Sequence, residues 1–176
     1  MRFEATKISG VFLVGLERII DERGFFARSW CEEEFGEYGL NPHLVQCNVS
    51  FNHRAGTVRG MHYQVPPHSE AKLVRVTRGA IFDVALDLRM GSPTRCQWIG
   101  VVLSADDYRS LYIPEGCAHG FQTLEDDTEV LYQMTERYHP ESAAGVRYND
   151  PAFGIEWPAV EIIVSQRDCS FEPFEP

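Results

Sequence analysis

The chain has 176 residues, of which 44% are hydrophobic and 24% charged, and these values are typical of one soluble globular domain spanning residues 1–176. Its formal net charge of −10 argues against a nucleic-acid-binding surface but leaves room for a local basic pocket that holds an anion. The apolar runs are too short to cross a bilayer and the first residues lack a secretory pattern, so we expect a cytoplasmic protein without membrane contact. Five cysteines without a C-x-x-C pair predict reduced thiols.

Short strand-like segments dominate the chain. Residues 6–20 predict two short strands, residues 25–30 predict another, and residues 31–38, with their acidic start, predict a short helix. Further strands are predicted at 44–50, 57–64, 71–78, 80–87, 97–103, 110–113, 120–123, 130–135 and 162–164. Gly, Pro, Asn or Asp separate them and no strand–helix–strand alternation is visible, which indicates a sandwich or barrel. The tail, 149–176, is predicted to wrap the outside of the barrel.

Two histidine-bearing motifs refine this fold prediction. The first, V-R-G-M-H-Y-Q-V-P-P-H-S-E-A-K-L-V-R-V-T-R-G (58–79), places Arg59, His62 and Lys72 on two strands joined by a tight turn. The second, P-E-G-C-A-H-G-F (114–121), carries His119 just after a turn. Two such motifs facing one interior are typical of an all-β, cupin-type jelly roll, or double-stranded β-helix, here with a few short helices. Metal-binding cupins carry an H-x-H pair in the first motif. His62 is instead followed by Tyr and Gln, so we expect no bound catalytic metal.

The residue types suggest acid–base chemistry on an anionic ligand, although each has a simpler interpretation. A histidine on an inward-facing strand is either a general base or a hydrogen-bonded core residue. A tyrosine at position 132 is either a proton donor or a packing residue, and Asp168 is either a loop residue or the partner of a histidine. The arginines at 23, 59 and 167 are either forks for phosphate or solvated surface charges.

Several linked motifs carry a resemblance to a known family. They include D-E-R-G-F-F (21–26), V-Q-C-N-V-S (45–50), V-R-G-M-H-Y-Q (58–64), A-K-L-V-R-V (71–76), I-P-E-G-C-A-H-G-F (113–121), L-Y-Q-M-T (131–135) and S-Q-R-D (165–168). In this order and spacing the chain closely resembles the dTDP-4-dehydrorhamnose 3,5-epimerases over nearly its whole length.

The resemblance implies a cofactor-independent isomerase on a cupin jelly roll, normally a homodimer, whose substrate is a dTDP-linked 4-keto-6-deoxyhexose. The implied reaction inverts C3 and C5 of dTDP-4-dehydro-6-deoxy-D-glucose to give dTDP-4-dehydro-L-rhamnose, in dTDP-L-rhamnose or related deoxysugar synthesis. The resemblance matches His62 to the family's base, Asp168 to its partner, Tyr132 to the acid and Lys72 to the cation at the C4 carbonyl. It also implies that Arg59 and Arg167 are diphosphate clamps, that Arg23, Gln46, Asn48 and His119 line the nucleotide-sugar site, and that Tyr138 stacks on the base.

The sequence departs from the family pattern at a few positions. Arg28 stands where many members have an acidic residue, Ala143 or Ala144 lies near a common Glu, and Tyr148 replaces a common Trp. These changes leave the proton-transfer set intact and leave open the nucleotide preference and the number of carbons inverted. Two alternatives therefore stand beside the 3,5-epimerase: a mono-epimerase acting at C3 or C5 of another 4-keto-6-deoxy sugar nucleotide, and a non-catalytic cupin that binds a nucleotide sugar.

Overall fold

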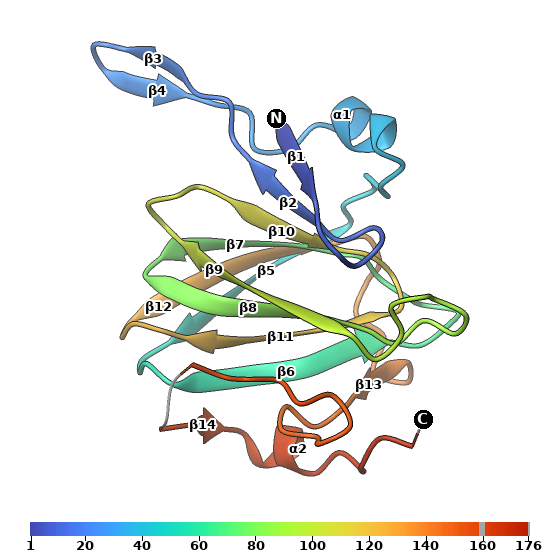
Figure 1. Cartoon of the computed structure of the whole chain (residues 1–176). Coiled ribbons are helices and arrows are strands. Elements are labelled where there is room, and N and C mark those ends of the chain that lie inside the picture. Colours follow the sequence, from blue (N-terminus) through green and yellow to red (C-terminus); the bar gives the residue numbers. More distant parts are fainter. Residues whose placement is uncertain (159–160, 176) are drawn as a thin grey trace.

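Two antiparallel sheets face each other in the computed structural model, which describes residues 1–158 and 161–175 (Figure 1). The first sheet has the order β1 (Arg2–Ala5), β2 (Phe12–Gly15), β10 (Ser110–Ile113), β7 (Lys72–Arg78), β12 (Thr128–Met134) and β5 (Gln46–Asn52). The second has the order β13 (Ala143–Gly145), β6 (Thr57–Gln64), β11 (Cys117–Thr123), β8 (Ala80–Asp87) and β9 (Trp98–Ser104), with β14 (Ile163–Val164) parallel to β6. This arrangement is the predicted all-β jelly roll.

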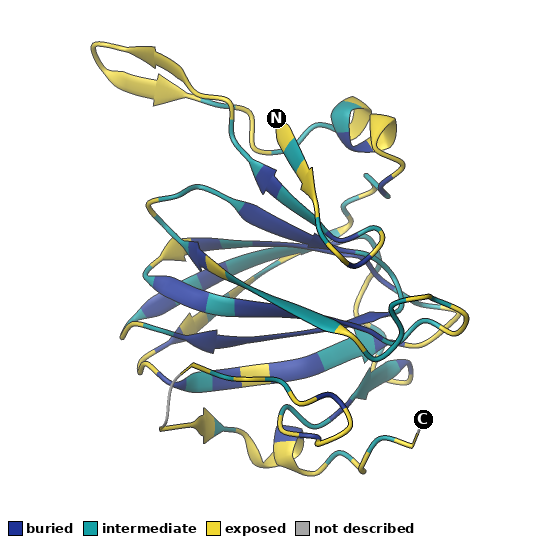
Figure 2. Cartoon of the chain, in the orientation of Figure 1, coloured by how far each residue is buried: buried dark blue, intermediate teal, exposed yellow. Residues whose placement is uncertain are grey.

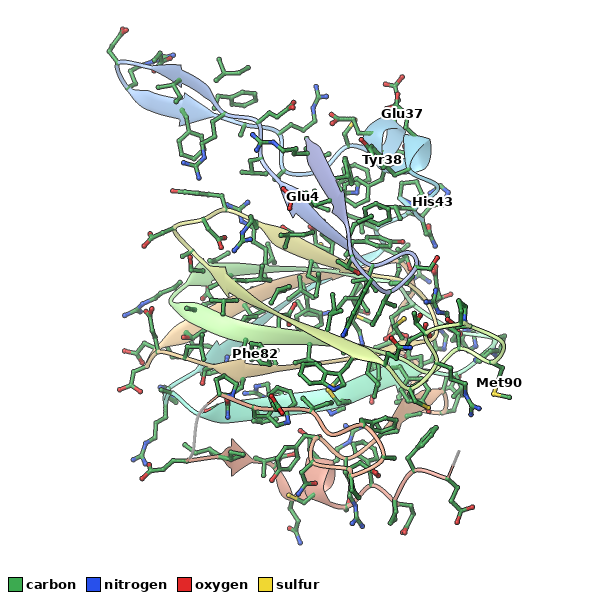
Figure 3. The ribbon with its side chains drawn as sticks, in the orientation of Figure 1. Glu4, Glu37, Tyr38, His43, Phe82 and Met90 are labelled. Atoms are coloured by element: carbon green, nitrogen blue, oxygen red, sulfur yellow. The ribbon has the colours of Figure 1, made fainter. Side chains whose placement is uncertain are left out.

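Three elements lie outside the two sheets. A hairpin of β3 (Ile19–Asp21) and β4 (Gly24–Phe26) projects away from the barrel, and Figure 2 shows it exposed along its length. The first helix, α1 (Glu32–Glu37), lies near the N-terminus; just after it, Tyr38 stacks on Phe3 of β1 with 4.2 Å between ring centroids (Figure 3). The second helix, α2 (Gln166–Cys169), lies in the C-terminal segment that runs below β6 in Figure 1. Among the described residues, no helix is long and apolar enough to cross a membrane.

An aliphatic cluster fills one part of the space between the sheets. It joins both layers, because Val74, Val130 and Leu111 come from the first sheet and Ile81 and Leu103 from the second, and all five are fully buried. Burying each side chain of this size contributes about 1.5–3 kcal/mol to folding. The cluster therefore fixes the two sheets relative to each other and supports the part of the interior that is not filled.

A second apolar cluster lies on the outer face of the second sheet and is covered by the tail. The indole nitrogen of Trp98 on β9 donates to the Phe153 carbonyl at 3.0 Å, and Phe153 packs against Phe174 with 4.8 Å between centroids. The edge of β6 is covered in turn by β14. The prediction that the tail wraps the barrel is thus confirmed for the described residues.

Most predicted strands are found, and β6, β8 and β10 have the predicted bounds. The prediction of a strand over 25–30 is wrong beyond Phe26, because the chain leaves the hairpin there and Trp30 packs beside α1. The strand β1 was not predicted, since three of its four residues are exposed and only its pairing with β2 defines it. The short elements β13 and α2 were also missed. Residues 159, 160 and 176 of the predicted tail lie outside the described residues.

Candidate active site

A cavity of about 870 Å³ opens between the two sheets next to the aliphatic cluster. Strands β5, β7 and β12 of the first sheet supply one wall, and β6 and β11 of the second supply the other. Its volume lies within the range of small-molecule sites, roughly 300–1,000 Å³. The predicted site residues that line it are His62, Tyr132, Asp168, Lys72, Gln46, Asn48, Arg59, His119, Tyr138 and Arg167. The structure thus brings together every predicted site residue except Arg23.

The most direct contact in the cavity joins an imidazole and a carboxylate. Nε2 of His62 lies 2.7 Å from Oδ1 of Asp168, although the two residues are 106 positions apart in the chain. The Asp168 side chain is 6% exposed and the imidazole is 41% exposed, so the carboxylate is held inside while the ring reaches the cavity. The pair was predicted from the sequence, and its geometry is that of a histidine oriented by a buried acid.

Helix α2 fixes the carboxylate of this pair. The Ser165 hydroxyl caps the helix by accepting from the Asp168 backbone N–H at 3.1 Å. Burial opposes ionisation of Asp168, but the hydrogen bond and charge of His62, together with further hydrogen bonds, outweigh it and hold the pKa of Asp168 below its usual value. The carboxylate is therefore ionised at neutral pH and places a negative charge beside the His62 ring.

Glycines allow β6 and β11 to approach closely enough to align two histidines. His62 lies directly opposite His119 in the strand register. A Cβ atom on Gly60 would lie 2.4 Å from the Cα of Gly120, and Gly60 has a φ of 143°. Only glycine fits such an approach and such a backbone angle. The glycines of the R-G-M-H and A-H-G-F motifs are thus required by packing beside the site.

His119 also has a buried carboxylate partner, which the sequence analysis missed. Its Nε2 lies 2.7 Å from Oδ1 of Asp83, a residue of β8 that is fully buried. The contact fixes the orientation of the second imidazole in the cavity wall. In the sequence, Asp83 lies within the apolar run A-I-F-D-V-A-L, and a single acid in such a run is the signal that could have identified it.

A phenol and an ammonium enter the cavity from the opposite sheet. Tyr132 on β12 pairs in register with Asn48 on β5, so both side chains are on the cavity face. Burial raises the pKa of Tyr132, and the positive charge of Arg59 opposes the rise only in part. The phenol is therefore protonated at neutral pH and is able to donate a proton.

The ammonium of Lys72 is buried and paired. Its Nζ lies 2.8 Å from Oε1 of Glu70 and donates to the His62 carbonyl at 2.9 Å, and the side chain is 8% exposed. An ammonium has three donors, so one remains for a ligand in the cavity. Glu70 is thus the counterion of this lysine.

The cavity rim is basic and polar. Nε of Arg59 donates to Oδ1 of Asn52 at 2.7 Å, and Arg167 projects from α2. Both arginines are exposed to solvent. Gln46 accepts from the backbone N–H of Tyr138 at 3.0 Å, which holds the half-exposed phenol ring at the edge. Asn52 was missed by the sequence analysis because nothing in a lone Asn signals its contact with Arg59.

Arg23 is the one predicted site residue that the cavity of the same chain does not contain. It lies at the turn of the β3–β4 hairpin, its side chain is 83% exposed, and it pairs with Asp21 at 2.5 Å. The resemblance matched Arg23 to the nucleotide-sugar site without saying whose barrel the hairpin approaches. The hairpin points away from its own barrel, as Figures 1 and 2 show.

Together these features define a class of protein. A cupin-type jelly roll holds an imidazole paired with a carboxylate on one wall of its cavity. The opposite sheet supplies a protonated phenol and an ammonium with one N–H left for a ligand, and two arginines lie at the opening. Such a site is suited to removing and returning protons on an anionic ligand, which is the chemistry of a sugar-nucleotide isomerase.

Comparisons with known proteins identify the family within that class. The family model for dTDP-4-dehydrorhamnose 3,5-epimerase matches residues 5–175. The enzyme of that name from Methanothermobacter thermautotrophicus is 44% identical over 175 residues, covering 98% of this chain and 94% of its own. The chain therefore belongs to the dTDP-4-dehydrorhamnose 3,5-epimerase family, as the resemblance predicted.

Two solved structures are also similar to this chain. The dTDP-4-dehydrorhamnose 3,5-epimerase from Bacillus anthracis with TDP and PPi bound has a TM-score of 0.94 and 39% identity, covering 98% of this chain and 99% of that one. A 3'-monoepimerase from Streptomyces bikiniensis in complex with dTDP-quinovose has a TM-score of 0.86 and 32% identity, covering 96% of this chain and 85% of that one.

Proposed function

We propose that the chain is a cofactor-independent epimerase, active as one domain, that inverts C3 and C5 of dTDP-4-dehydro-6-deoxy-D-glucose to give dTDP-4-dehydro-L-rhamnose. The observation that carries the proposal is the placement of His62 and Asp168 on one side of the cavity, with Tyr132 and Lys72 entering from the opposite sheet. Inversion at carbon requires a base on one face and an acid on the other, and this cavity supplies both.

The first step is removal of a proton next to the C4 ketone. When Nε2–H of His62 is donated to Asp168, the lone pair of Nδ1 is free to take the hydrogen from C3 or C5. The electrons of the broken C–H bond move onto the C4 oxygen and form an enolate. The ionised Asp168 stabilises the resulting imidazolium, which is the role of the acid in a histidine–carboxylate pair.

Lys72 is proposed to stabilise the enolate oxygen. Two of its donors are used by Glu70 and by the His62 carbonyl, and the third is directed to the developing negative charge. Electrostatic stabilisation of a developing charge is strongest when the donor is already in position and the site is partly removed from water. Because the ammonium is already paired, the empty site does not carry an isolated buried charge.

Tyr132 is proposed to return the proton to the opposite face of the carbon. The enolate collapses to the ketone as the phenol O–H bond breaks and a new C–H bond forms with inverted configuration. Arg59 lies close enough to lower the cost of the tyrosinate that is left. Solvent then reprotonates the tyrosinate and removes the proton from the imidazolium, so no oxidant, reductant or cofactor takes part.

The basic rim is proposed to hold the nucleotide. Arg59 and Arg167 are the forks for the diphosphate, since guanidinium groups bind such oxygens with two parallel hydrogen bonds. Gln46 and Asn48 contact the nucleotide sugar, and Tyr138 stacks on the base. The TDP and PPi bound to the similar Bacillus anthracis enzyme support a dTDP-linked substrate.

We propose that two copies of the chain form a homodimer through the β3–β4 hairpin. Ile19, Ile20 and Phe26 are 69%, 77% and 73% exposed, and an isolated two-stranded hairpin with such side chains is marginally stable in water. Packing against a second copy buries them and carries Arg23 to the rim of the partner's cavity. Native mass spectrometry should give a dimer, and charged substitutions at Ile20 and Phe26 should give a monomer.

The decisive experiment follows deuterium from solvent into the sugar. With dTDP-4-dehydro-6-deoxy-D-glucose in D₂O, NMR should give label at both C3 and C5 and a rhamno-configured product. Label at one carbon alone supports the mono-epimerase, an alternative favoured by the likeness to the Streptomyces bikiniensis 3'-monoepimerase. Binding without label supports a non-catalytic cupin and overturns the proposal. Separately, the cytoplasmic location expected from the sequence remains a prediction.

A further inference from the structure

We propose that His68, Glu136 and His139 bind a divalent transition-metal ion of the Zn²⁺ class at the edge of the cavity, outside the proton-transfer set. Their ligand atoms all lie within 4.8 Å of one another, and they are the one such group of His, Cys, Asp or Glu among the described residues. Two imidazoles and one carboxylate are an established ligand set for Zn²⁺. The inference rests on these residues and is independent of the proposed reaction.

A carboxylate prepares His139 as a ligand. Nδ1 of His139 lies 3.1 Å from Oε1 of Glu141, so the ring donates Nδ1–H to that carboxylate and keeps the Nε2 lone pair. Nε2 in turn lies 3.8 Å from Oε1 of Glu136. A carboxylate that fixes the far nitrogen of a metal-binding histidine is the usual arrangement around such ions.

The two imidazoles are already side by side. The rings of His68 and His139 stack with 3.5 Å between centroids and 8° between planes. The nitrogen lone pairs of two parallel rings point in parallel directions, so one or both rings have to tilt before the two nitrogens can share one ion. Metal–nitrogen bonds of about 2.0–2.1 Å require ligand atoms about 3.4 Å apart, so the side chains have to close by roughly an ångström.

A single buried amide holds the two backbone segments that carry these ligands. The Gln64 side chain is 3% exposed. Its Nε2 donates to the carbonyls of His68 at 2.8 Å and Arg137 at 3.1 Å, and its Oε1 accepts from the N–H of His139 at 2.6 Å. The backbone frame is thus set before an ion arrives, which lowers the entropic cost of binding.

The position of the cluster gives the ion a structural role. Tyr138 lies between Glu136 and His139 in the chain, lines the cavity, and donates its backbone N–H to Gln46. An ion bound by residues on both sides of Tyr138 in the chain would therefore stiffen this part of the cavity rim. His62, the proposed base, is not among the ligands, so proton transfer does not pass through the ion.

The test measures metal binding by the full chain after treatment with a chelator. Titration calorimetry with Zn²⁺ should give one ion per chain. His68→Ala, His139→Ala and Glu136→Gln should each weaken binding by roughly 100-fold, and Glu141→Gln by about tenfold, as for partners behind the ligands. His53→Ala is the matched control, because His53 is an exposed histidine next to an acid, and it should leave the affinity unchanged.

Two measurements on the unmodified chain keep the proposal open to refutation if a variant fails to fold. The visible spectrum of bound Co²⁺ should be that of a tetrahedral nitrogen–oxygen site, and Zn²⁺ anomalous scattering in a crystal should give a peak between His68, Glu136 and His139. Thiolate bands, a peak elsewhere, wild-type affinity in both histidine variants, or an equal loss in His53→Ala would each overturn the site.

Discussion

The two parts of the space between the sheets are built from the same strands in opposite ways. On β12, Val130 enters the aliphatic cluster, and two residues later Tyr132 lines the cavity. On β7, Val74 and Val76 are in the cluster, while Lys72 at the start of the strand is in the cavity. The cluster is held by non-directional burial, whereas each polar cavity group depends on a named partner. Damage to the first should lower stability, and damage to the second should lower turnover.

The largest effect is expected from removing the proposed base. His62→Ala should reduce deuterium exchange at both C3 and C5 by roughly 10²–10⁴-fold, because a positioned base contributes about that factor. The free energy of unfolding should fall by only about 1–3 kcal/mol, because the ring is 41% exposed but its removal takes away the partner of the buried Asp168 carboxylate. Near-normal turnover in this variant would rule out the assignment of the base.

A substitution in the aliphatic cluster should lower stability and leave turnover nearly unchanged. Leu111→Ala removes a fully buried side chain and should lower the free energy of unfolding by about 2–5 kcal/mol, as is typical of core Leu→Ala changes. Turnover per folded molecule should stay near that of the unmodified chain. Urea denaturation and an active-site titration together separate the two quantities, and a selective loss of turnover would contradict the division between cluster and cavity.

A smaller and more specific effect is expected at the proposed acid. Tyr132→Phe should reduce completed inversion at C5 by roughly 10²-fold while initial exchange is reduced less, because the base remains and only proton return is lost. Time-resolved NMR in D₂O measures the two rates in one sample. Equal losses of exchange and inversion would indicate that Tyr132 serves the whole reaction and not its second half.

The carboxylate beside the base links the cavity to stability. Folding lowers the pKa of Asp168 below its ordinary value of about 3.9. The ionised carboxylate therefore stabilises the fold at pH values above about 3.9, and this contribution is lost as the pH falls through the lower pKa of the folded state. Asp168→Asn should therefore destabilise the chain by about 1–3 kcal/mol at neutral pH. The gap between the two unfolding curves should close in acid, and a gap independent of pH would contradict the ionised pair.

The smallest effect is expected from a chelator. Epimerisation should continue in EDTA, because His62, Tyr132 and Lys72 perform each proposed step without an ion. Turnover that is lost with EDTA and restored by one specific metal would overturn this prediction. A change in the melting temperature alone would fit an ion bound at His68 and His139.

The parts of the molecule that could be predicted from sequence are those defined locally. Alternation and turn residues gave β6, β8 and β10 their correct bounds, and the two histidine motifs indicated the jelly roll. Contacts set by tertiary structure could not be derived in this way. Nothing local distinguishes Asp83 as the partner of His119, and nothing in D-E-R-G says that Arg23 points away from its own barrel.

Asp168 reaches His62 from a helix near the chain's end, beside a tail whose Phe171 ring lies 6.1 Å from the imidazole centroid. The barrel strands that hold His62, Tyr132 and Lys72 all precede this segment. During synthesis, the base therefore gains its orienting acid only after residues 163–168 have docked along β6. A chain cleaved before β14 would keep the barrel strands and lose the carboxylate that orients His62, so turnover would report that the segment 163–168 is in place.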